Sequence, residues 1–278
     1  MTLSNKEKLR LQSKYGPWAL VSGASSGIGK ALAERLADAG LNLIINARSK
    51  SSLDALKGEL EESRGVEVKV VATDLSSSEG IQELIRSTAH MEIGLLVASA
   101  GFGTSGNFLD TSVHAETNMM RVNMEALLVL THHFSQYFAN KQKGGIILLS
   151  SMVAFQGVPF ASNYAATKAY VQTLAEGISV ELKPHHVDVL AAAPGPVSSG
   201  FAKRANMQMD MTLSPEDVAV PILKALGRKT TVLPGFLTKL LVYSLRTAPR
   251  SLKVRIMKQV MGGMTAHQRK ETQTVVTG

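Results

Sequence analysis

Short apolar runs recur along the chain, and longer stretches with apolar residues three or four positions apart separate them. The runs occupy residues 18–21, 41–45, 66–71, 94–98, 145–149, 187–192 and 231–233. Runs of this length are typical of buried strands, and the spacing between them is typical of amphipathic helices. The alternation predicts βαβ units in an α/β fold. We therefore expect a doubly wound, mainly parallel sheet of about seven strands with helices on both faces.

Small and polar residues follow several of these apolar runs directly. Gly23, Asp74, Gly101, Ser151 and Gly195 each come after one of the predicted strands. In open parallel sheets, ligands bind outside the carboxyl ends of the strands. Residues that are far apart in the sequence are therefore expected to gather along one rim of the sheet.

The first apolar run leads into a glycine-rich loop. Residues 18–29 have the sequence WALVSGASSGIG, with Gly23, Gly27 and Gly29 in the pattern G-x-x-x-G-x-G, and a helical pattern follows from Ile28 onward. Glycines permit a tight turn and let a helix N-terminus approach a phosphate. This indicates a Rossmann-like dinucleotide site. The alternative is a loop whose small residues only let a helix pack closely on a strand.

A second signal is the pair Tyr164 and Lys168, with Ser151 thirteen residues before the tyrosine. Residues four apart on a helix are surface neighbours. An ammonium beside a phenol favours the phenolate, so we expect the tyrosine pKa to lie below its usual value of about 10. Such a group can exchange the proton of a carbonyl/alcohol couple. Taken alone, the pair also fits a half-buried tyrosine beside a solvated lysine.

Together and in this order, the motifs resemble those of the short-chain dehydrogenase/reductase family. The resemblance extends from about Trp18 to Ala219. It is carried by Ser22 to Gly29, Asp74-Leu75, Asn123, Ser151, Tyr164, Lys168 and the turn Pro194-Gly195-Pro196-Val197-Ser198-Ser199. Two positions depart from the family. Its N-N-A-G is here Ala98-Ser99-Ala100-Gly101, which lacks an amide side chain beside the cofactor, and Ser199 replaces a threonine but keeps the hydroxyl.

The resemblance implies an oxidoreductase that interconverts a carbonyl and an alcohol by hydride transfer. It assigns Tyr164 as the general acid/base and Ser151 as the group that holds the substrate oxygen. Lys168 is expected to lower the tyrosine pKa and to bind the nicotinamide ribose, while Asn123 connects the lysine to solvent. The neighbouring Ser150 is expected to be a structural hydroxyl at the strand end.

Cofactor choice depends on the segment after the second strand. An NAD site needs a carboxylate about 20 residues beyond the glycines. The segment from Ile44 to Ser49 has none, but it has Arg48, whose guanidinium suits a 2′-phosphate. We therefore predict NADP, with Ser49 and Ser25 as further phosphate ligands, although an ordinary surface arginine is the alternative. The cofactor-binding residues that we predict are Gly23, Ser25, Ser26, Gly27, Ile28, Gly29, Arg48, Asp74, Leu75, Ala100, Gly101, Tyr164, Lys168, Pro194, Gly195 and Val197.

Thioether and aromatic side chains gather where the family places a mobile lid and on nearby loops. They are Phe201, Met207, Met209, Met211 and Leu213, with Phe102, Phe155 and Phe160. Such side chains form adaptable apolar pockets. We predict a hydrophobic carbonyl or alcohol substrate, although the same residues could simply close the core.

Length and composition agree with these expectations. A chain of 278 residues with 45% hydrophobic content can bury one large core. We expect one domain over residues 1–278, with its core at about 16–235. The chain has no cysteine, which excludes disulfides and thiolate metal sites, and we assign no metal ligands. Residues 1–14 are too polar for a signal peptide and no apolar stretch is long enough to span a membrane, so we expect a cytoplasmic protein.

The C-terminal part has a distinct charge pattern. No acidic residue occurs from Val218 to Lys270, whereas this segment contains eleven lysines and arginines in a chain of net charge +8. Apolar residues recur at helical spacing on both sides of Pro249. We expect a basic, amphipathic extension at about 236–278. It would either contact an anionic membrane surface or pack on the parent domain or a second copy.

Four further expectations concern function, assembly and partners. A carrier-linked 3-oxoacyl reductase is an alternative, with the basic surface docking an acidic carrier, and a non-catalytic NADP-binding regulator is another. The resemblance implies a homo-oligomer, a dimer or tetramer, paired through helices at about 112–138 and 161–183. Their apolar residues Leu127, Leu128, Leu130, Leu174 and Ile178 could equally face the sheet of the same chain. A nucleic-acid partner is not expected, because the basic segment has few interleaved aromatics.

Overall fold

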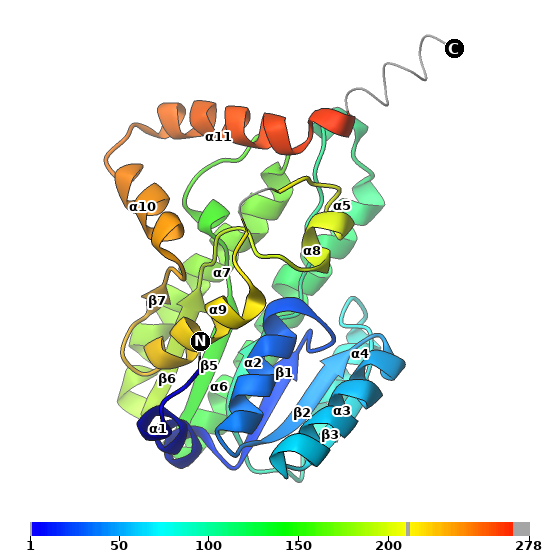
Figure 1. Ribbon diagram of the computed structural model, residues 1–278, viewed down its shortest axis with the longest axis vertical. Coiled ribbons are helices and arrows are strands. Elements are labelled where there is room, and N and C mark those ends of the chain that lie inside the picture. Colours follow the sequence, from blue (N-terminus) through cyan, green and yellow to red (C-terminus); the bar gives the residue numbers. More distant parts are fainter. Residues whose placement is uncertain (1, 210–211, 269–278) are drawn as a thin grey trace.

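The computed structural model describes residues 2–209 and 212–268 and contains a seven-stranded parallel sheet (Figure 1). Its strand order is β3-β2-β1-β4-β5-β6-β7, so the order reverses direction beside β1. The strands are β1 (Trp18–Ser22), β2 (Asn42–Ala47), β3 (Val68–Ala72), β4 (Ile93–Ala98), β5 (Gly144–Leu149), β6 (Val187–Ala192) and β7 (Thr231–Val232). Each strand overlaps one predicted apolar run, so the predicted fold class is confirmed.

The helices alternate with the strands along the chain. They are α1 (Asn5–Tyr15), α2 (Gly27–Asp38), α3 (Lys50–Arg64), α4 (Ser78–Thr88), α5 (Val113–Met120), α6 (Leu127–Lys141), α7 (Ser162–Glu181), α8 (Gly200–Arg204), α9 (Pro215–Ala225), α10 (Phe236–Ser244) and α11 (Arg250–Met264). Short 3₁₀ turns are η1 (Phe108–Asp110), η3 (Met152–Phe155) and η4 (Lys183–His185), while η2 (Arg121–Ala126) is a π-helical turn. None of the helices in the described part of the chain is both long and apolar enough to span a membrane.

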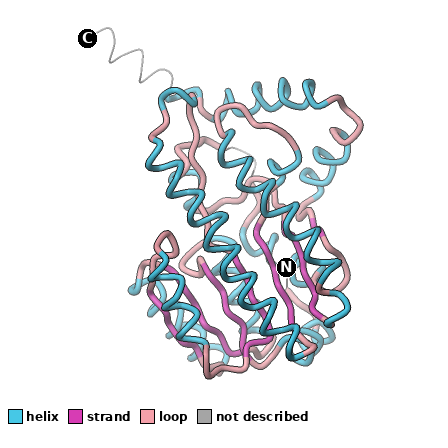
Figure 2. Tube along the Cα trace, turned by 180° about the vertical axis from the view of Figure 1, so that it is seen from behind, coloured by secondary structure: helices cyan, strands magenta, loops and turns pink. Residues whose placement is uncertain are grey.

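Two buried clusters lie on the two faces of the sheet. Because side chains alternate along a strand, Leu43 and Ile45 pack on the side of α2, α3 and α9, while Ile44 between them packs on the opposite side. On that second side, α4, α6 and α7 contribute apolar residues to the cluster, and long helices cross the sheet there (Figure 2). Both faces are therefore covered, which explains why the strands are continuous apolar runs.

The long helices expected at the oligomer contact bury most of their apolar residues within the chain. The first one is divided into α5, η2 and α6. Leu127 and Leu130 are buried, and Leu174 and Ile178 pack against the same core, whereas Leu128 is 42% exposed. The sequence left open whether these residues face a second copy or the sheet of their own chain. Leu127, Leu130, Leu174 and Ile178 face the sheet of their own chain.

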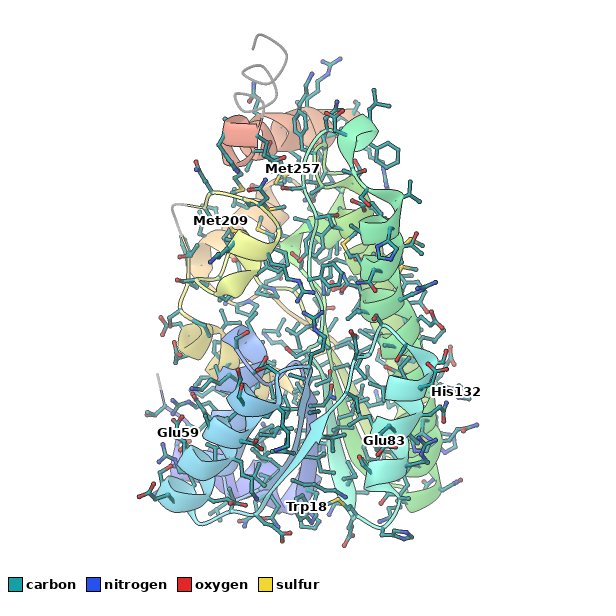
Figure 3. All side chains as sticks on the ribbon, turned by 90° about the vertical axis from the view of Figure 1, so that its right-hand side faces the viewer. Trp18, Glu59, Glu83, His132, Met209 and Met257 are labelled. Atoms are coloured by element: carbon teal, nitrogen blue, oxygen red, sulfur yellow. The ribbon has the colours of Figure 1, made fainter. Side chains whose placement is uncertain are left out.

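The C-terminal segment forms α10 and α11, which lie beyond the carboxyl ends of the strands (Figure 1). The two helices are separated close to Pro249, as the spacing predicts. A third buried cluster lies at this end of the molecule, where Met257 and Met261 of α11 meet Phe102 and Tyr164. In Figure 3, Met209 and Met257 lie at this end, and Trp18, at the start of β1, lies at the opposite one. Arg269 and Lys270 lie outside the described residues.

Candidate active site

The glycine loop joins β1 to α2 in a tight turn. Gly23 and Gly27 have φ values of +69° and +57°, which favour glycine. A Cβ on Gly23 would lie 2.8 Å from the Ala100 Cα, and a Cβ on Gly29 would collide with the Gly23 carbonyl oxygen. Ser26 begins α2 without a side-chain capping bond. The first helical turn, whose residues Gly27, Ile28 and Gly29 line a cleft, therefore keeps backbone N–H groups that no capping side chain occupies, as an anion site requires.

Replacing Gly23 with alanine should reduce stability. The added Cβ meets backbone atoms of Ala100 and the residue has a positive φ, so we expect a loss of about 1–3 kcal/mol in the free energy of unfolding. Gly58→Ala is a matched control, because that glycine lies inside α3 with no atom near its Cβ. It should stabilise the protein by about 0.4–1 kcal/mol. Equal effects of the two substitutions in urea unfolding would contradict this account.

Ser22 links the glycine loop to the segment after β4. Its Oγ accepts hydrogen bonds from the backbone N–H groups of Ser99 and Ala100, each at 3.1 Å. This contact fixes the altered Ala98-Ser99-Ala100-Gly101 segment against the first strand. Gly101 packs against two of the predicted catalytic residues, because a Cβ there would lie 3.0 Å from Asn123 Oδ1 and 3.5 Å from Lys168 Nζ.

The end of β2 forms the adjoining part of the cleft. Asn46 is buried, and its Nδ2 donates to the Val71 carbonyl and to Thr73 Oγ1, both at 2.9 Å. Its Oδ1 has no partner among the described residues. Arg48, two residues further on, is exposed and lines the same wall. Asp74 lies there as well and accepts a bond from the Ser76 N–H.

Ser151, Tyr164 and Lys168 lie together where β5 and α7 meet. All three are buried, and the Ser151 hydroxyl lies close enough to the Tyr164 phenol to act on its pKa. Lys168 Nζ donates to the Leu149 carbonyl at 2.7 Å and lies 5.9 Å from the centre of the Tyr164 ring. Ser150 Oγ instead donates to the Lys168 carbonyl at 3.0 Å, which confirms its predicted structural role.

The pKa values of the tyrosine and the lysine depend first on burial. Burial raises the pKa of Tyr164 to about 12, and the Ser151 hydroxyl opposes this only in part. Burial alone lowers the pKa of Lys168 to about 8. The sequence prediction of a lowered tyrosine pKa was therefore wrong for the protein itself. The ammonium is bonded to a backbone carbonyl and stands beside the ring, so desolvation of the phenolate dominates.

These pKa values predict a pH profile for the NADPH-dependent carbonyl reduction that the resemblance in the sequence implies. Tyr164 stays protonated from pH 6 to 10, whereas Lys168 loses its charge as the pH rises through about 8. We expect kcat/KM for NADPH, which reports the free enzyme, to be level below pH 8 and to fall about tenfold per pH unit above it. In Lys168→Arg, the decline should move beyond pH 10, because guanidinium stays charged. A wild-type profile that is level from pH 7 to 10 would contradict the assignment.

Asn123 lies in the π-helical turn η2, behind the cleft wall. It is fully buried; its Nδ2 donates to the Phe102 carbonyl at 2.9 Å and to Thr167 Oγ1 at 3.1 Å. Its Oδ1 accepts from the Phe102 N–H at 3.1 Å. The side chain therefore joins η2 to α7 one residue before Lys168. Such π-turns often occur at functional sites, yet no residue pattern in the sequence predicts this one.

The remaining part of the cleft is apolar. Phe201 packs against Tyr164 with ring centres 5.2 Å apart, and Phe102, Met207, Met209 and Leu213 line the same wall. Of the other predicted substrate residues, Phe155 and Phe160 lie outside this lining, and Met211 lies outside the described residues. The sequence prediction missed part of the lining, which the C-terminal helices provide: Leu237, Thr238, Leu241, Leu245, Ile256, Met257, Val260, Met261 and Met264. Their helical spacing was visible, but it did not indicate which way they face.

One cleft of about 1310 Å³ collects these features. All sixteen predicted cofactor-binding residues and Ser151 line it, whereas Asn123 lies behind it. Single drug-sized ligands occupy pockets of about 300–1,000 Å³, so this volume suits a dinucleotide together with a substrate. The close approach at Gly23, the free N–H groups of α2 and the unpartnered Asn46 Oδ1 are features that fit such a dinucleotide.

Comparison with known proteins adds family information. The family model described as short chain dehydrogenase matches residues 17–210. A 7beta-hydroxysteroid dehydrogenase from Clostridium sardiniense is 31% identical over 235 residues, covering 83% of this chain and 90% of the relative. A very-long-chain 3-oxoacyl-CoA reductase from Podospora anserina is 35% identical over 186 residues, covering 65% of this chain and 55% of the relative.

Solved structures agree with these matches. One from a study of 7beta-hydroxysteroid dehydrogenase stereoselectivity has a TM-score of 0.83 and 28% identity, covering 89% of this chain and 98% of that one. A short-chain dehydrogenase from Sphingobium yanoikuyae in complex with NADPH has a TM-score of 0.78 and 29% identity, covering 86% and 95%. The likeness thus extends over most of the fold.

Proposed function

The chain belongs to the short chain dehydrogenase family, and from this we propose that it is an NADP(H)-dependent oxidoreductase that interconverts a carbonyl and an alcohol on a hydrophobic substrate. The observation that supports this most is the position of Ser151, Tyr164 and Lys168. They line the same cleft as the glycine loop, and Tyr164 is in contact with the apolar side chain of Phe201. A substrate that is held by the apolar side chains would therefore have its reacting carbon beside Tyr164 and within reach of a cofactor bound at the glycine loop.

The residues of the chain have separate tasks in this proposal. When bound, the cofactor supplies or accepts the hydride. Tyr164, protonated at neutral pH because burial raises its pKa, gives its hydroxyl proton to the substrate oxygen during reduction. Ser151 donates a hydrogen bond to that oxygen, and Lys168 holds a positive charge beside the phenol as it ionises. Asn123 fixes η2 against α7 and so positions Lys168.

NADP is the cofactor that the cleft wall favours. The end of β2 has Arg48 and no carboxylate in the segment from Ile44 to Ser49, so a 2′-phosphate would meet a cation and no repulsion. The similar Sphingobium yanoikuyae structure holds NADPH. With NADPH as the cellular reductant, we infer that ketone or aldehyde reduction is the working direction.

The size and lining of the cleft favour a bulky substrate. The apolar half is lined by six methionines, Met152, Met207, Met209, Met257, Met261 and Met264. Methionine adapts to irregular shapes, and the 7beta-hydroxysteroid relatives act on a fused ring system. We propose a fused-ring or similarly bulky ketone as the substrate class.

The proposal is tested by NADPH oxidation with purified protein. Bulky ring ketones, small ketones, aldehydes and 3-oxoacyl thioesters serve as substrates, and products are identified by mass spectrometry. We expect turnover with bulky ketones and at least about tenfold lower kcat/KM with small ones, because lost apolar contacts cost about 1–3 kcal/mol. Tight NADPH binding without turnover on any compound would instead support the NADP-binding regulator.

A 3-oxoacyl thioester reductase is the second candidate function. The similar Podospora anserina protein is named a very-long-chain 3-oxoacyl-CoA reductase, and exposed cations on α11 suit an acidic carrier. Turnover with carrier-linked substrate that Arg250→Glu and Arg255→Glu abolish would favour it over the free ketone.

Our proposals for assembly and domain organisation also rest on the family. We infer one domain over residues 1–278 that pairs into a homo-oligomer, with Leu128 of α6 and Val180 of α7, 42% and 73% exposed, at the contact. Size-exclusion chromatography with light scattering should give a dimer or tetramer. A monomer at micromolar concentration would contradict this pairing.

A further inference from the structure

Helix α10 has apolar residues on two of its faces. Its nine residues, FLTKLLVYS, contain one charged side chain, Lys239. Leu237 and Leu241 line the cleft on one face, whereas the other face presents the residues Phe236, Leu240 and Tyr243, which are 81%, 51% and 60% exposed. Helices that are apolar on all sides are normally covered by protein or by lipid. The exposed face of α10 therefore lacks its covering within the described chain.

Helix α11 adds positive charge to the same end of the molecule. Its Met257 and Met261 are buried toward the cleft, while Arg250, Arg255 and Lys258 are exposed. Lys239 and Arg246 are exposed nearby along the chain, and no acidic residue occurs from Val218 to Lys270. The surface formed by α10 and α11 thus combines exposed apolar side chains with unopposed cations. Membrane-surface helices have this composition.

The cleft reaches the surface at these two helices. Leu237, Leu241 and Val260 line the cleft and are also 44%, 38% and 44% exposed. They therefore form a rim at which the apolar half of the cleft meets the outside. The two helices that bear them, α10 and α11, lie at the end of the molecule beyond the strands (Figure 1). An apolar compound that leaves a lipid phase at this rim need not cross water to reach Tyr164.

We propose that the face formed by α10 and α11 binds an anionic lipid surface, and that the hydrophobic substrate enters the cleft from that surface. Phe236, Leu240 and Tyr243 insert among the lipids while the cations contact the headgroups. Charge complementarity selects this partner, because each cation near an anionic bilayer contributes favourably and additively. The entry route rests on the proposed apolar substrate, but the binding itself does not.

Vesicle co-sedimentation tests the binding without any turnover. The full-length protein is mixed with vesicles of phosphatidylcholine alone or with 30 mol% phosphatidylglycerol, at low and at physiological salt. We expect binding to the anionic vesicles, weakened by salt. Charge reversal of Arg250, Arg255 and Lys258 should lower the partition coefficient by more than about 100-fold, since the loss of each cation alone costs about fivefold and each new carboxylate is repelled in addition. Serine at Phe236, Leu240 and Tyr243 should lower it at least about tenfold.

Matched control variants test whether binding depends on this particular surface or on exposed positive charge and apolar side chains anywhere on the protein. Charge reversal at the exposed Lys6, Lys143 and Lys183, and serine at the exposed Leu109 and Val113, should leave binding unchanged. The lipid proposal is overturned if the wild type does not sediment, or if the α11 variant binds as tightly as the wild type. It is also overturned if serine in α10 only dissociates an oligomer, or if an acidic carrier binds while vesicles do not. Vesicle binding without turnover would contradict the proposed function alone.

Discussion

Tyr164→Phe should lower kcat/KM for carbonyl reduction about 1,000-fold, within the range of about 10²–10⁴ that a positioned general acid contributes. The substitution removes only the hydroxyl, which acts with the Ser151 hydroxyl in the cleft. The ring itself is kept, so its contact with Phe201, at 5.2 Å between the ring centres, should be kept as well. The measurement is NADPH oxidation at saturating cofactor with the best ketone.

Cofactor binding separates a catalytic loss from a structural one. NADPH affinity, followed by its fluorescence, should change less than about threefold, since the phosphates bind elsewhere in the cleft. Tyr170→Phe is the matched control, because that tyrosine lies on α7 as well but packs against the core cluster of the sheet. It should retain wild-type turnover. A Tyr164→Phe enzyme with more than a tenth of wild-type activity would remove Tyr164 from the acid/base role.

The sheet could be predicted from the sequence because its strands are buried on both faces. Ile44 and Ile45 point to opposite sides and both are buried, so the strand is a continuous apolar run rather than an alternating one. The rim residues followed from the same pattern, since each strand end is marked by a change to small or polar residues. Local patterns thus fix which elements form and where they end.

Other features depend on contacts between distant segments. The helical spacing of residues 250–264 predicts a helix, but it does not indicate that Met257 joins the buried cluster of Tyr164 and lines the same cleft. The pKa of Tyr164 is similarly set by burial within the folded chain, which no i, i+4 pattern contains. Asn123 lies in a π-turn, which adds one residue to a helix. Its proposed role in positioning Lys168 rests on its hydrogen bonds to Phe102 and Thr167. Three-dimensional packing decides all three.

Arg48→Ala should remove most of the preference for NADPH over NADH. A charge-assisted hydrogen bond to the 2′-phosphate contributes about 1.5–3 kcal/mol, so the Kd for NADPH should rise about 10–100-fold. The Kd for NADH should change less than about threefold, since it has no phosphate there. Lys50→Ala is the matched control, because Lys50 is an exposed neighbour paired with Asp54 at 2.6 Å. Fluorescence titration of each variant with both cofactors provides the comparison.

Arg204 provides a second cation that this experiment must separate from Arg48. It lines the same cleft, its guanidinium lies 4.3 Å from the centre of the Phe102 ring, and its pKa is lowered by burial and by the charge of Arg48. If both cations face one phosphate, their contributions to NADPH affinity should not be additive. The loss in the double alanine variant should then differ from the sum of the two single losses by at least about 0.5 kcal/mol, in either direction. Additive losses would assign the two arginines to separate phosphates of the cofactor. Equal weakening of NADPH and NADH by Arg48→Ala would show that Arg48 does not recognise the 2′-phosphate.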